Sequence, residues 1–300
     1  MGDAEALDPR INAFRPELAD VRLKGRVEAQ SFAEGTLKRV AVSQAPLKRS
    51  PLVAAPMDSE VVLGEVVRVF GDTSDGWSFC QCAFDSYVGF IPTQVLGDME
   101  PEPTHRVTAP RTFLYPSPDL KLPPRATLVA GSRIAVDGQA TTRGTVYRLL
   151  RGGDGAVVDV DVEPLETPLA SDFVAVAERF INTPYLWGGR TSRGVDCSGF
   201  VQLVLSLTGR SVPRDTDLQA KTIGDPVADG LDGTLERGDI VIWPGHALII
   251  RDRDTVIHSS GHHMRVVVEP TGEAFRRLLK VVGQPSGVRR LVPGPASSAA

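Results

Sequence analysis

The sequence predicts two small β-rich modules followed by one α+β domain. Strand-length runs rich in Val, Phe and Tyr fill the first half of the chain, and prolines between Pro92 and Pro168 interrupt any helical period. After Thr167 the pattern changes to two helical stripes and then to four strand-length runs. The expected division is an N-terminal extension at 1–30, β-barrels at 31–100 and 101–166, the α+β domain at 167–290 and a disordered tail at 291–300.

The composition argues against several classes of protein. The chain has 300 residues, of which 42% are hydrophobic, and this is enough for folded cores. A formal net charge of -4 without long blocks of like charge disfavours nucleic acid and an anionic membrane surface as partners. Charges interrupt the first 24 residues where an export signal would be apolar, and no run approaches the roughly 18 apolar residues of a membrane helix, so a cytoplasmic location is expected.

The first β-rich module is predicted from the runs VVLGEVVRVF, WSFCQCAF and DSYVGFIP, which lie between Glu60 and Pro92. The second module is predicted between Arg106 and Glu163 from ATLVAGSRIAV, TVYRLLRGG and GAVVDVDVEPL. Cys80 and Cys82 would point to one face of a strand, but a zinc site needs about four ligands, and no Cys or His cluster lies nearby in sequence. We therefore expect two reduced barrel cysteines, no metal and no cofactor.

The α+β domain is predicted from helix and strand signals in order. Ser171 is the expected cap of a first helix through AVAERFIN, and DCSGFVQLVLSLTG predicts a second helix that starts at Cys197 and ends at Gly209. The runs GDIVIWPG, HALIIRD, DTVIHSSG and MRVVVEP predict four antiparallel strands packed on that second helix.

Cys197 is the cysteine whose setting argues for reactivity, because a helix N-terminus lowers the pKa of a thiol and the thiolate is the nucleophile. A buried structural cysteine is the commoner fate of a lone thiol. Asp196 and Ser198 are polar where a core helix would carry apolar residues, so this helix end is expected to face a cleft.

A cysteine nucleophile needs a base, and the base needs a group that orients its ring. His246 opens one predicted strand and His258 ends the next, so adjacent antiparallel strands would bring them together as base and orienting residue. His262 or His263, in the turn SSGHHM, is the alternative to His258.

The segments YLWGG, DCSGFVQ, VPRDT, GDIVIW, GHALII and IHSS resemble the NlpC family of cell-wall cysteine peptidases, which has a papain-like catalytic core. The resemblance covers roughly 168–282, and the preceding barrels resemble the SH3-type modules that many family members carry. It implies that Cys197 is the nucleophile, His246 the base and His258 the third polar residue. It also implies an oxyanion site made by the Cys197 backbone N–H and the Tyr185 hydroxyl.

One subgroup of that family fits the sequence best, namely the cytoplasmic γ-D-glutamyl-L-diamino-acid endopeptidases, which act on freed muropeptides that begin with L-Ala. In them an acidic residue before the nucleophile holds the free amine, and Asp196 matches that position, although it is equally suited to be a helix N-cap. Ser198, Asp215 and Thr216 match positions that line the D-Glu side of the cleft, and ordinary turn residues are the competing interpretation.

The first barrel of the subgroup supplies a Tyr and a Glu that close over the amine. Tyr87 matches the Tyr, and the choice for the Glu stays open between Glu60, which is preferred, and Glu65. The resemblance thus implies a cysteine endopeptidase of peptidoglycan recycling that cuts between γ-D-Glu and meso-diaminopimelate or Lys in peptides with a free N-terminal L-Ala. The alternatives are an acyl or amide transferase with the same triad, and a cell-wall binding protein with an inert catalytic domain.

Overall fold

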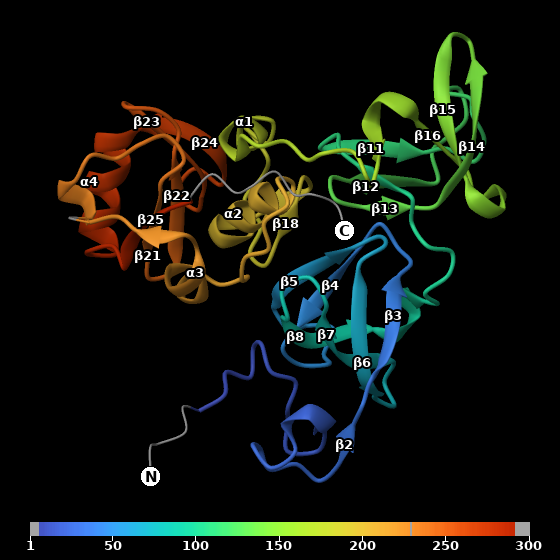
Figure 1. Cartoon of the computed structure of the whole chain (residues 1–300), viewed down its shortest axis with the longest axis horizontal. Helices are drawn as coiled ribbons and strands as arrows, with labels where there is room; N and C mark the ends of the chain where they lie inside the picture. Colours follow the sequence, from blue (N-terminus) through green and yellow to red (C-terminus); the bar gives the residue numbers. More distant parts are fainter. Residues whose placement is uncertain (1–5, 229, 292–300) are drawn as a thin grey trace.

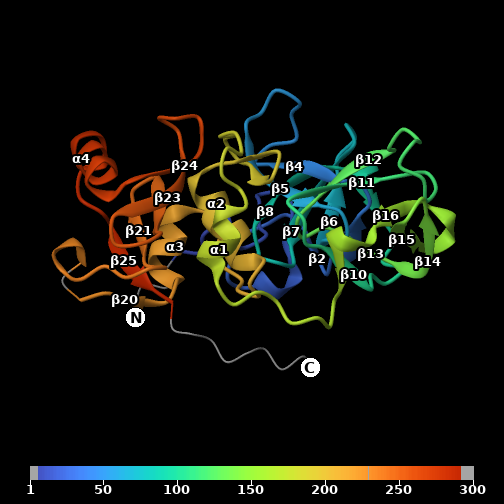
Figure 2. The same cartoon turned by 90° about the horizontal axis from the view of Figure 1, so that it is seen from above.

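The computed structural model describes residues 6–228 and 230–291. Figure 1 shows an α+β domain on one side, coloured yellow to red, and two β modules on the other, coloured blue to green. The first β module lies between the α+β domain and the second β module. A view from above shows this order along the longest axis of the molecule (Figure 2).

The first β module contains one seven-stranded sheet in the order β5-β4-β8-β7-β6-β3-β9. Its strands are β3 (Thr36–Val40), β4 (Gln44–Lys48), β5 (Met57–Val62), β6 (Val66–Asp72), β7 (Trp77–Cys82), β8 (Val88–Pro92) and β9 (Leu96–Gly97). Fully buried β-branched and aliphatic side chains, such as Leu47, Val67 and Ile91, form its core. Cys80 and Cys82 are free thiols buried in that core.

The second β module divides its strands among three small sheets. These are β13-β10-β17 (Arg133–Ile134, His105–Val107, Val162–Pro164), β11-β12 (Arg111–Leu114, Ala126–Val129) and β14-β15-β16 (Val136–Thr142, Thr145–Leu150, Ala156–Val158). Val107, Leu128 and Val157 are buried at the centre of the module. Within the described residues neither β module closes into a barrel, because the edge strands are not paired with one another.

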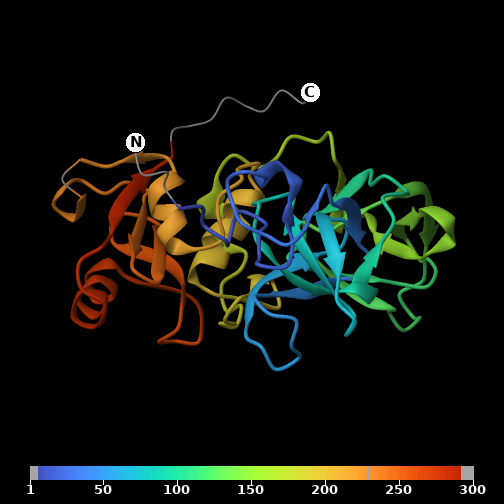
Figure 3. The same ribbon diagram turned by 90° about the horizontal axis from the view of Figure 1, so that it is seen from below.

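The segment before the first module packs along that module rather than standing apart from it. Two short strands, β1 (Ala19–Asp20) and β2 (Phe32–Ala33), pair in parallel, and buried Ala13 joins the aromatic cluster of Phe70, Trp77, Phe79 and Phe90. Figure 3 shows this segment in dark blue, crossing from the first module toward the α+β domain.

The α+β domain is built on one six-stranded sheet in the order β20-β25-β21-β22-β23-β24. The bounds are β20 (Asp225–Pro226), β21 (Ile240–Trp243), β22 (His246–Ile250), β23 (Thr255–Ser260), β24 (Arg265–Pro270) and β25 (Gly287–Arg290). The prediction of four consecutive antiparallel strands is confirmed by β21 to β24. The sequence reasoning missed β25, which pairs with β21 from the end of the domain.

Helices cover both faces of this sheet. They are α1 (Phe173–Glu178), α2 (Cys197–Ser206), α3 (Thr216–Thr222) and α4 (Thr271–Val281). Apolar residues of α2 pack against inward side chains of β22 and β23, and α4 packs on the other face. The predicted cap of α1 is wrong by one residue, because the Asp172 carboxylate, not Ser171, accepts from the N–H groups of Val174 and Ala175.

Two further observations complete the fold. The longest described helix, α4, has 11 residues, and none of the helices in 6–228 and 230–291 is long and apolar enough to cross a membrane. The tail predicted to be disordered, 291–300, lies outside the described residues except for its first position.

Candidate active site

Cys197 is the first residue of α2 and faces a cleft of about 230 Å³. The residue before it, Asp196, caps the helix by accepting from the backbone N–H of Gly199 at 2.7 Å. The Cys197 sulfur lies 3.5 Å from the carbonyl oxygen of Gly245, the residue before His246. The cleft is lined by Arg10, Arg49, Asp58, Tyr87, Tyr185, Trp187, Asp196, Cys197, Ser198, Arg214, Asp215, Thr216, Asp217 and Gly245.

The two predicted histidines lie side by side on adjacent strands. Nε2 of His246, on β22, is 2.8 Å from Nδ1 of His258, on β23, and the two rings stand nearly edge to face. His258 is fully buried, whereas His262 and His263 lie beyond the end of β23, where the His263 ring contacts Ser260. The contact of His246 is therefore with His258, and its Nδ1 is the nitrogen left to exchange a proton with a thiol.

Burial sets the charge of both groups at rest. Burial and the neighbouring Asp196 carboxylate raise the pKa of Cys197 to about 12, although backbone N–H groups and Arg214 act in the opposite sense. Burial, and then His258, lower the pKa of His246 to about 3. The expected lowering of the Cys197 pKa by the helix start is thus outweighed by desolvation, so at rest the thiol of Cys197 and the imidazole of His246 are both neutral.

Tyr185 lines the same cleft, in the segment that leads to Cys197. Its backbone N–H donates to the carbonyl of Met264 at 2.9 Å, and it forms a parallel bridge to Val195. Burial raises the pKa of Tyr185, so its hydroxyl stays protonated and can donate a hydrogen bond. Gly188 follows with a φ of +75°, where a Cβ atom would lie 2.4 Å from the carbonyl oxygen of Met57. The loop therefore reaches the first β module through a position that only glycine fills without strain.

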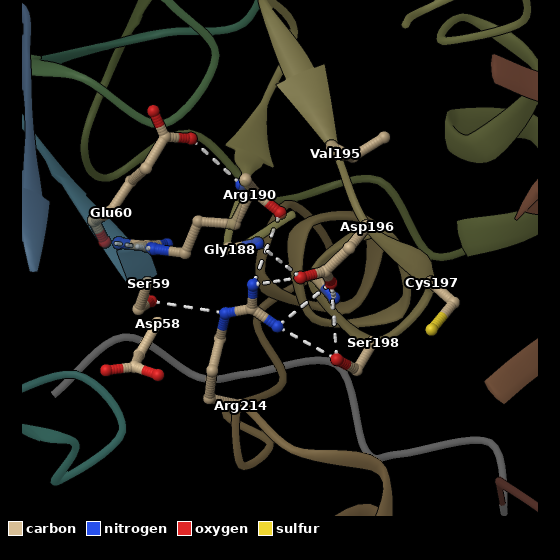
Figure 4. A network of polar contacts seen from close by, with 12 residues as sticks. Asp58, Ser59, Glu60, Gly188, Arg190, Val195, Asp196, Cys197, Ser198 and Arg214 are labelled. Atoms are coloured by element: carbon tan, nitrogen blue, oxygen red, sulfur yellow. Dashed lines mark hydrogen bonds and ion pairs between the residues drawn. The ribbon is translucent and has the colours of Figure 1, made fainter. Parts of the chain in front are cut away.

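A buried ion pair lies behind Cys197, and Figure 4 shows it in full. Arg214 is 1% exposed, and it donates to the two carboxylate oxygens of Asp196 at 3.0 and 2.6 Å. It also donates to the hydroxyls of Ser198, at 2.8 Å, and of Ser59, at 3.2 Å. Asp196 additionally accepts from the backbone N–H of Gly188 at 2.9 Å. The N-cap interpretation of Asp196 is confirmed, and the carboxylate expected to hold a substrate amine also lines the cleft beside Arg214.

The two glutamates expected to contact that amine lie elsewhere. The Glu60 carboxylate accepts from the backbone N–H of Arg190 at 3.0 Å, and the Glu65 carboxylate pairs with the guanidinium of the same residue. In Figure 4 the Glu60 carboxylate points toward Arg190 and away from Cys197. Both glutamates thus join the first β module to the α+β domain, and the expectation that Glu60 or Glu65 contacts an amine in the cleft is corrected by this placement.

Asp58 is the acidic residue of the first module that does line the cleft, and the sequence reasoning missed it. It lies where the pairing of β4 with β5 shifts register, between the partners Leu47–Ser59 and Lys48–Met57. Such a bulge changes the direction of a side chain, so the in-and-out alternation of side chains along a strand did not predict that Asp58 faces the cleft. The Asp58 carboxylate is 3.2 Å from the guanidinium of Arg49, another residue of the cleft.

The remaining predicted residues meet at the opposite wall. Tyr87 donates its hydroxyl to Asp215 at 3.0 Å, and Arg10 of the N-terminal segment donates to Asp215 and Asp217, both at 2.8 Å. Thr216 accepts from the backbone N–H of Gly245 at 3.2 Å, which fixes the residue before His246. Arg10 also pairs with Asp8 of its own segment, but its place in the cleft had no signal in the sequence, because Asp215 and Asp217 are about two hundred positions away.

Comparison with known proteins identifies the domains. Residues 182–281 match the NlpC/P60 family, and residues 47–96 match the bacterial dipeptidyl-peptidase Sh3 domain. The chain carries an NlpC/P60 domain. The NlpC/P60 match includes Cys197, His246 and His258, and the Sh3 match includes Asp58 and Tyr87.

Several curated proteins resemble the chain. It is 24% identical to "Dipeptidyl-peptidase 6" of Lysinibacillus sphaericus over 74% of its own length and 86% of that protein. It is 29% identical to "Gamma-D-glutamyl-L-lysine dipeptidyl-peptidase" of Bacillus subtilis over 62% of its length. The alignment spans 64% of the latter protein, which is less than two thirds.

Solved structures share the fold. A crystal structure of an NlpC/P60 family protein from Bacillus cereus superposes with a TM-score of 0.68 at 21% identity, over 86% of this chain and all of that one. At that identity the likeness concerns the fold, which is the NlpC/P60 papain-like arrangement of helices and sheet.

Proposed function

We propose that the chain is a cysteine endopeptidase that hydrolyses the bond between γ-D-Glu and the next diamino acid, meso-diaminopimelate or Lys, in freed peptides that begin with L-Ala-γ-D-Glu. The observation that carries this proposal is a small cleft that ends at Cys197 and is walled by residues of both the NlpC/P60 and the first β module. A cleft of about 230 Å³ suits a short freed peptide better than an intact wall. The names of the relatives support the same bond.

The proposed chemistry is acyl transfer through Cys197. Its thiol loses a proton to Nδ1 of His246 as the sulfur attacks the γ-carbonyl of D-Glu, and the backbone N–H of Cys197 with the Tyr185 hydroxyl receives the developing oxyanion. His246 then gives its proton to the amine of the departing diamino acid and takes one from the water that releases L-Ala-D-Glu. His258 holds the ring of His246 throughout.

We assign recognition of the free amine to Asp58 with the Tyr87 hydroxyl, in place of Glu60. The cleft lining contains four aspartates and three arginines, so its formal charge is negative by one, and an ammonium group would restore neutrality. Asp58 is 17% exposed and its Arg49 partner is 78% exposed, so this pair opens more easily than the buried pair of Asp196. An acetylated or glycan-linked L-Ala would offer no charge at this point and would be rejected.

Ser198, Asp215 and Thr216 are proposed to line the D-Glu side through positions that the structure already fixes. Ser198 is held by Arg214, Asp215 by Tyr87 and Arg10, and Thr216 by Gly245. Side chains locked in this way present rigid walls, which favours selection of one stem geometry.

The experiment compares L-Ala-γ-D-Glu-meso-diaminopimelate with its N-acetylated form by mass spectrometry, with Cys197→Ala as the blank. Release of L-Ala-D-Glu is expected from the free peptide alone. In Asp58→Asn the cleavage rates of the free and the N-acetylated peptide should become more similar. Equal cleavage of both peptides would contradict the amine assignment but keep the peptidase. Capture of the acyl group by an added amine instead of water would favour the transferase, and no reaction with either peptide would favour a binding protein.

The domain division and the cellular setting belong to the same proposal. We infer an N-terminal extension at 1–30, a second SH3-like module at 101–166 after the Sh3 domain within 31–100, and the catalytic domain at 167–290. A role in recycling inside the cytoplasm would place the protein beside freed peptides and away from the wall. Cell fractionation with an antibody to the chain tests this placement.

A further inference from the structure

The orienting histidine is itself held by a buried carboxylate on the next strand. Nε2 of His258 lies 2.7 Å from Oε1 of Glu269, on β24, and the two side chains are 1% and 9% exposed. On the far side of Glu269, Arg277 of α4 donates to both carboxylate oxygens, at 2.8 Å for Oε2. A continuous chain of contacts thus runs from His246 through His258 and Glu269 to Arg277.

This chain of contacts determines where the protons lie. Burial raises the pKa of Glu269, but the hydrogen bonds from His258 and Arg277 outweigh it and lower the pKa to about 2, so the carboxylate is ionised and only accepts. Nε2 of His258 must therefore carry a hydrogen. Burial lowers the pKa of His258, so the ring is neutral and its Nδ1 is bare. Bare Nδ1 accepts from Nε2–H of His246, and this leaves Nδ1 of His246 unprotonated.

We propose that Glu269, held by Arg277, is a positioning residue that fixes the tautomers of both histidines, so that the nitrogen of His246 left for Cys197 is always the unprotonated one. This inference rests on the proposed roles of Cys197 as nucleophile and His246 as base. When His246 takes the thiol proton it becomes an imidazolium, and the Glu269 carboxylate stabilises that charge through His258.

Glu269→Met tests the assignment because methionine fills the space of the glutamate without offering an acceptor. Nε2–H of His258 then has no partner, so the hydrogen is no longer held on Nε2. Where it moves to Nδ1, His258 donates to His246, whose own hydrogen moves to Nδ1. The base is lost in that fraction of the protein, and kcat should fall roughly 10–10⁴-fold, the upper value being that for a wrong tautomer.

A second substitution distinguishes this reasoning from a general loss of structure. In Glu269→Gln with Arg277→Met the amide is free to turn its oxygen to His258, so kcat should be at least about tenfold above that of Glu269→Met. Glu273→Gln is the matched control, because Glu273 is an exposed glutamate of α4 and only Arg277 of this chain of contacts lies near it. Its kcat should match that of the unchanged protein.

The direct readout is the ¹⁵N spectrum of the histidine side chains in full-length Cys197→Ala protein, which does not depend on catalysis. The unchanged carboxylate should give Nε2–H on both His246 and His258, and Glu269→Met should move hydrogen to Nδ1 on both. Nδ1–H on His258 in the presence of Glu269, or unchanged tautomers in Glu269→Met, would overturn the proposal. A tautomer shift in Glu269→Met, combined with no peptide cleavage by the protein that keeps Cys197, would uphold the role of Glu269 and refute the proposed function instead.

Discussion

Replacement of Arg214 by methionine is expected to destabilise the protein by about 3 kcal/mol. The change removes five hydrogen bonds, two of them to Asp196, and leaves that carboxylate buried without its counter-charge. Breaking a buried ion pair from one side costs roughly 3–5 kcal/mol. Asp196 keeps the backbone N–H groups of Gly188 and Gly199, so the lower end of that range applies. Methionine fills the space of the arginine stem, which limits any cavity contribution.

The assay is guanidinium chloride unfolding of the full chain, followed by far-UV circular dichroism and by tryptophan fluorescence to test whether the two transitions coincide. Arg237→Met is the matched control, because the Arg237–Asp172 pair is about half exposed and should contribute less than about 0.5 kcal/mol.

The double variant Asp196→Asn with Arg214→Met decides whether the isolated charge is the cause. Asparagine still caps α2, and no buried charge remains, so the double variant should be more stable than Arg214→Met alone by about 1–2 kcal/mol. A loss below about 1 kcal/mol in Arg214→Met, or a double variant at least as unstable as the two single changes added together, would refute this reasoning.

Three further outcomes are expected. Tyr185→Phe should lower kcat by about 10²–10³ with little change in KM, since one oxyanion donor is removed, and equal kinetics would exclude that role. A pKa of about 12 leaves about one Cys197 thiol in 10⁴ ionised at pH 8. The rate of Cys197 alkylation by iodoacetamide should therefore rise with pH without an inflection between about pH 5 and 8. An inflection in that range would instead indicate a thiolate–imidazolium pair. Because the pKa of His246 is lowered in the folded protein, the unfolded chain binds a proton at this residue first as pH falls. The contribution of His246 to stability is therefore fully present above about pH 6.5 and declines as pH falls toward 3. In His246→Gln the urea midpoint should depend less on pH between about pH 6.5 and 4.5, and an unchanged pH dependence would contradict the burial argument.

Local patterns predicted the parts of the site that lie on regular elements. The start of α2 at Cys197 and the adjacency of His246 and His258 follow from a capped amphipathic run and from strand-length apolar runs, which short-range physics determines. Asp58 escaped because it lies at a bulge, and bulges depend on the partner strand as much as on the sequence. Arg10 escaped because the two cleft carboxylates that it contacts, Asp215 and Asp217, come from a different module.

Glu60 shows why residue type alone misassigns a role. Glu60 on β5 matches the Glu position of the subgroup by residue type. However, the buried guanidinium of Arg190 requires acceptors, and Glu60 and Glu65 supply them. A buried cation needs a partner within the folded protein, because an unpaired one would cost several kcal/mol of folding free energy. The same rule explains the contact of Asp196 with Arg214, which donates to both its oxygens.

The proposed chemistry and the proposed specificity rest on different contacts. The α+β domain contains Cys197, His246, His258 and Glu269. The proposed proton transfer and the tautomers that support it therefore do not require the first β module. Asp58 and Tyr87, in contrast, reach the cleft because that module is docked. A change at the docking interface, such as Arg190→Met, should therefore raise KM and weaken the preference for a free amine while the histidine tautomers stay as they are. A shift of those tautomers in Arg190→Met would show that the two sets of contacts are coupled.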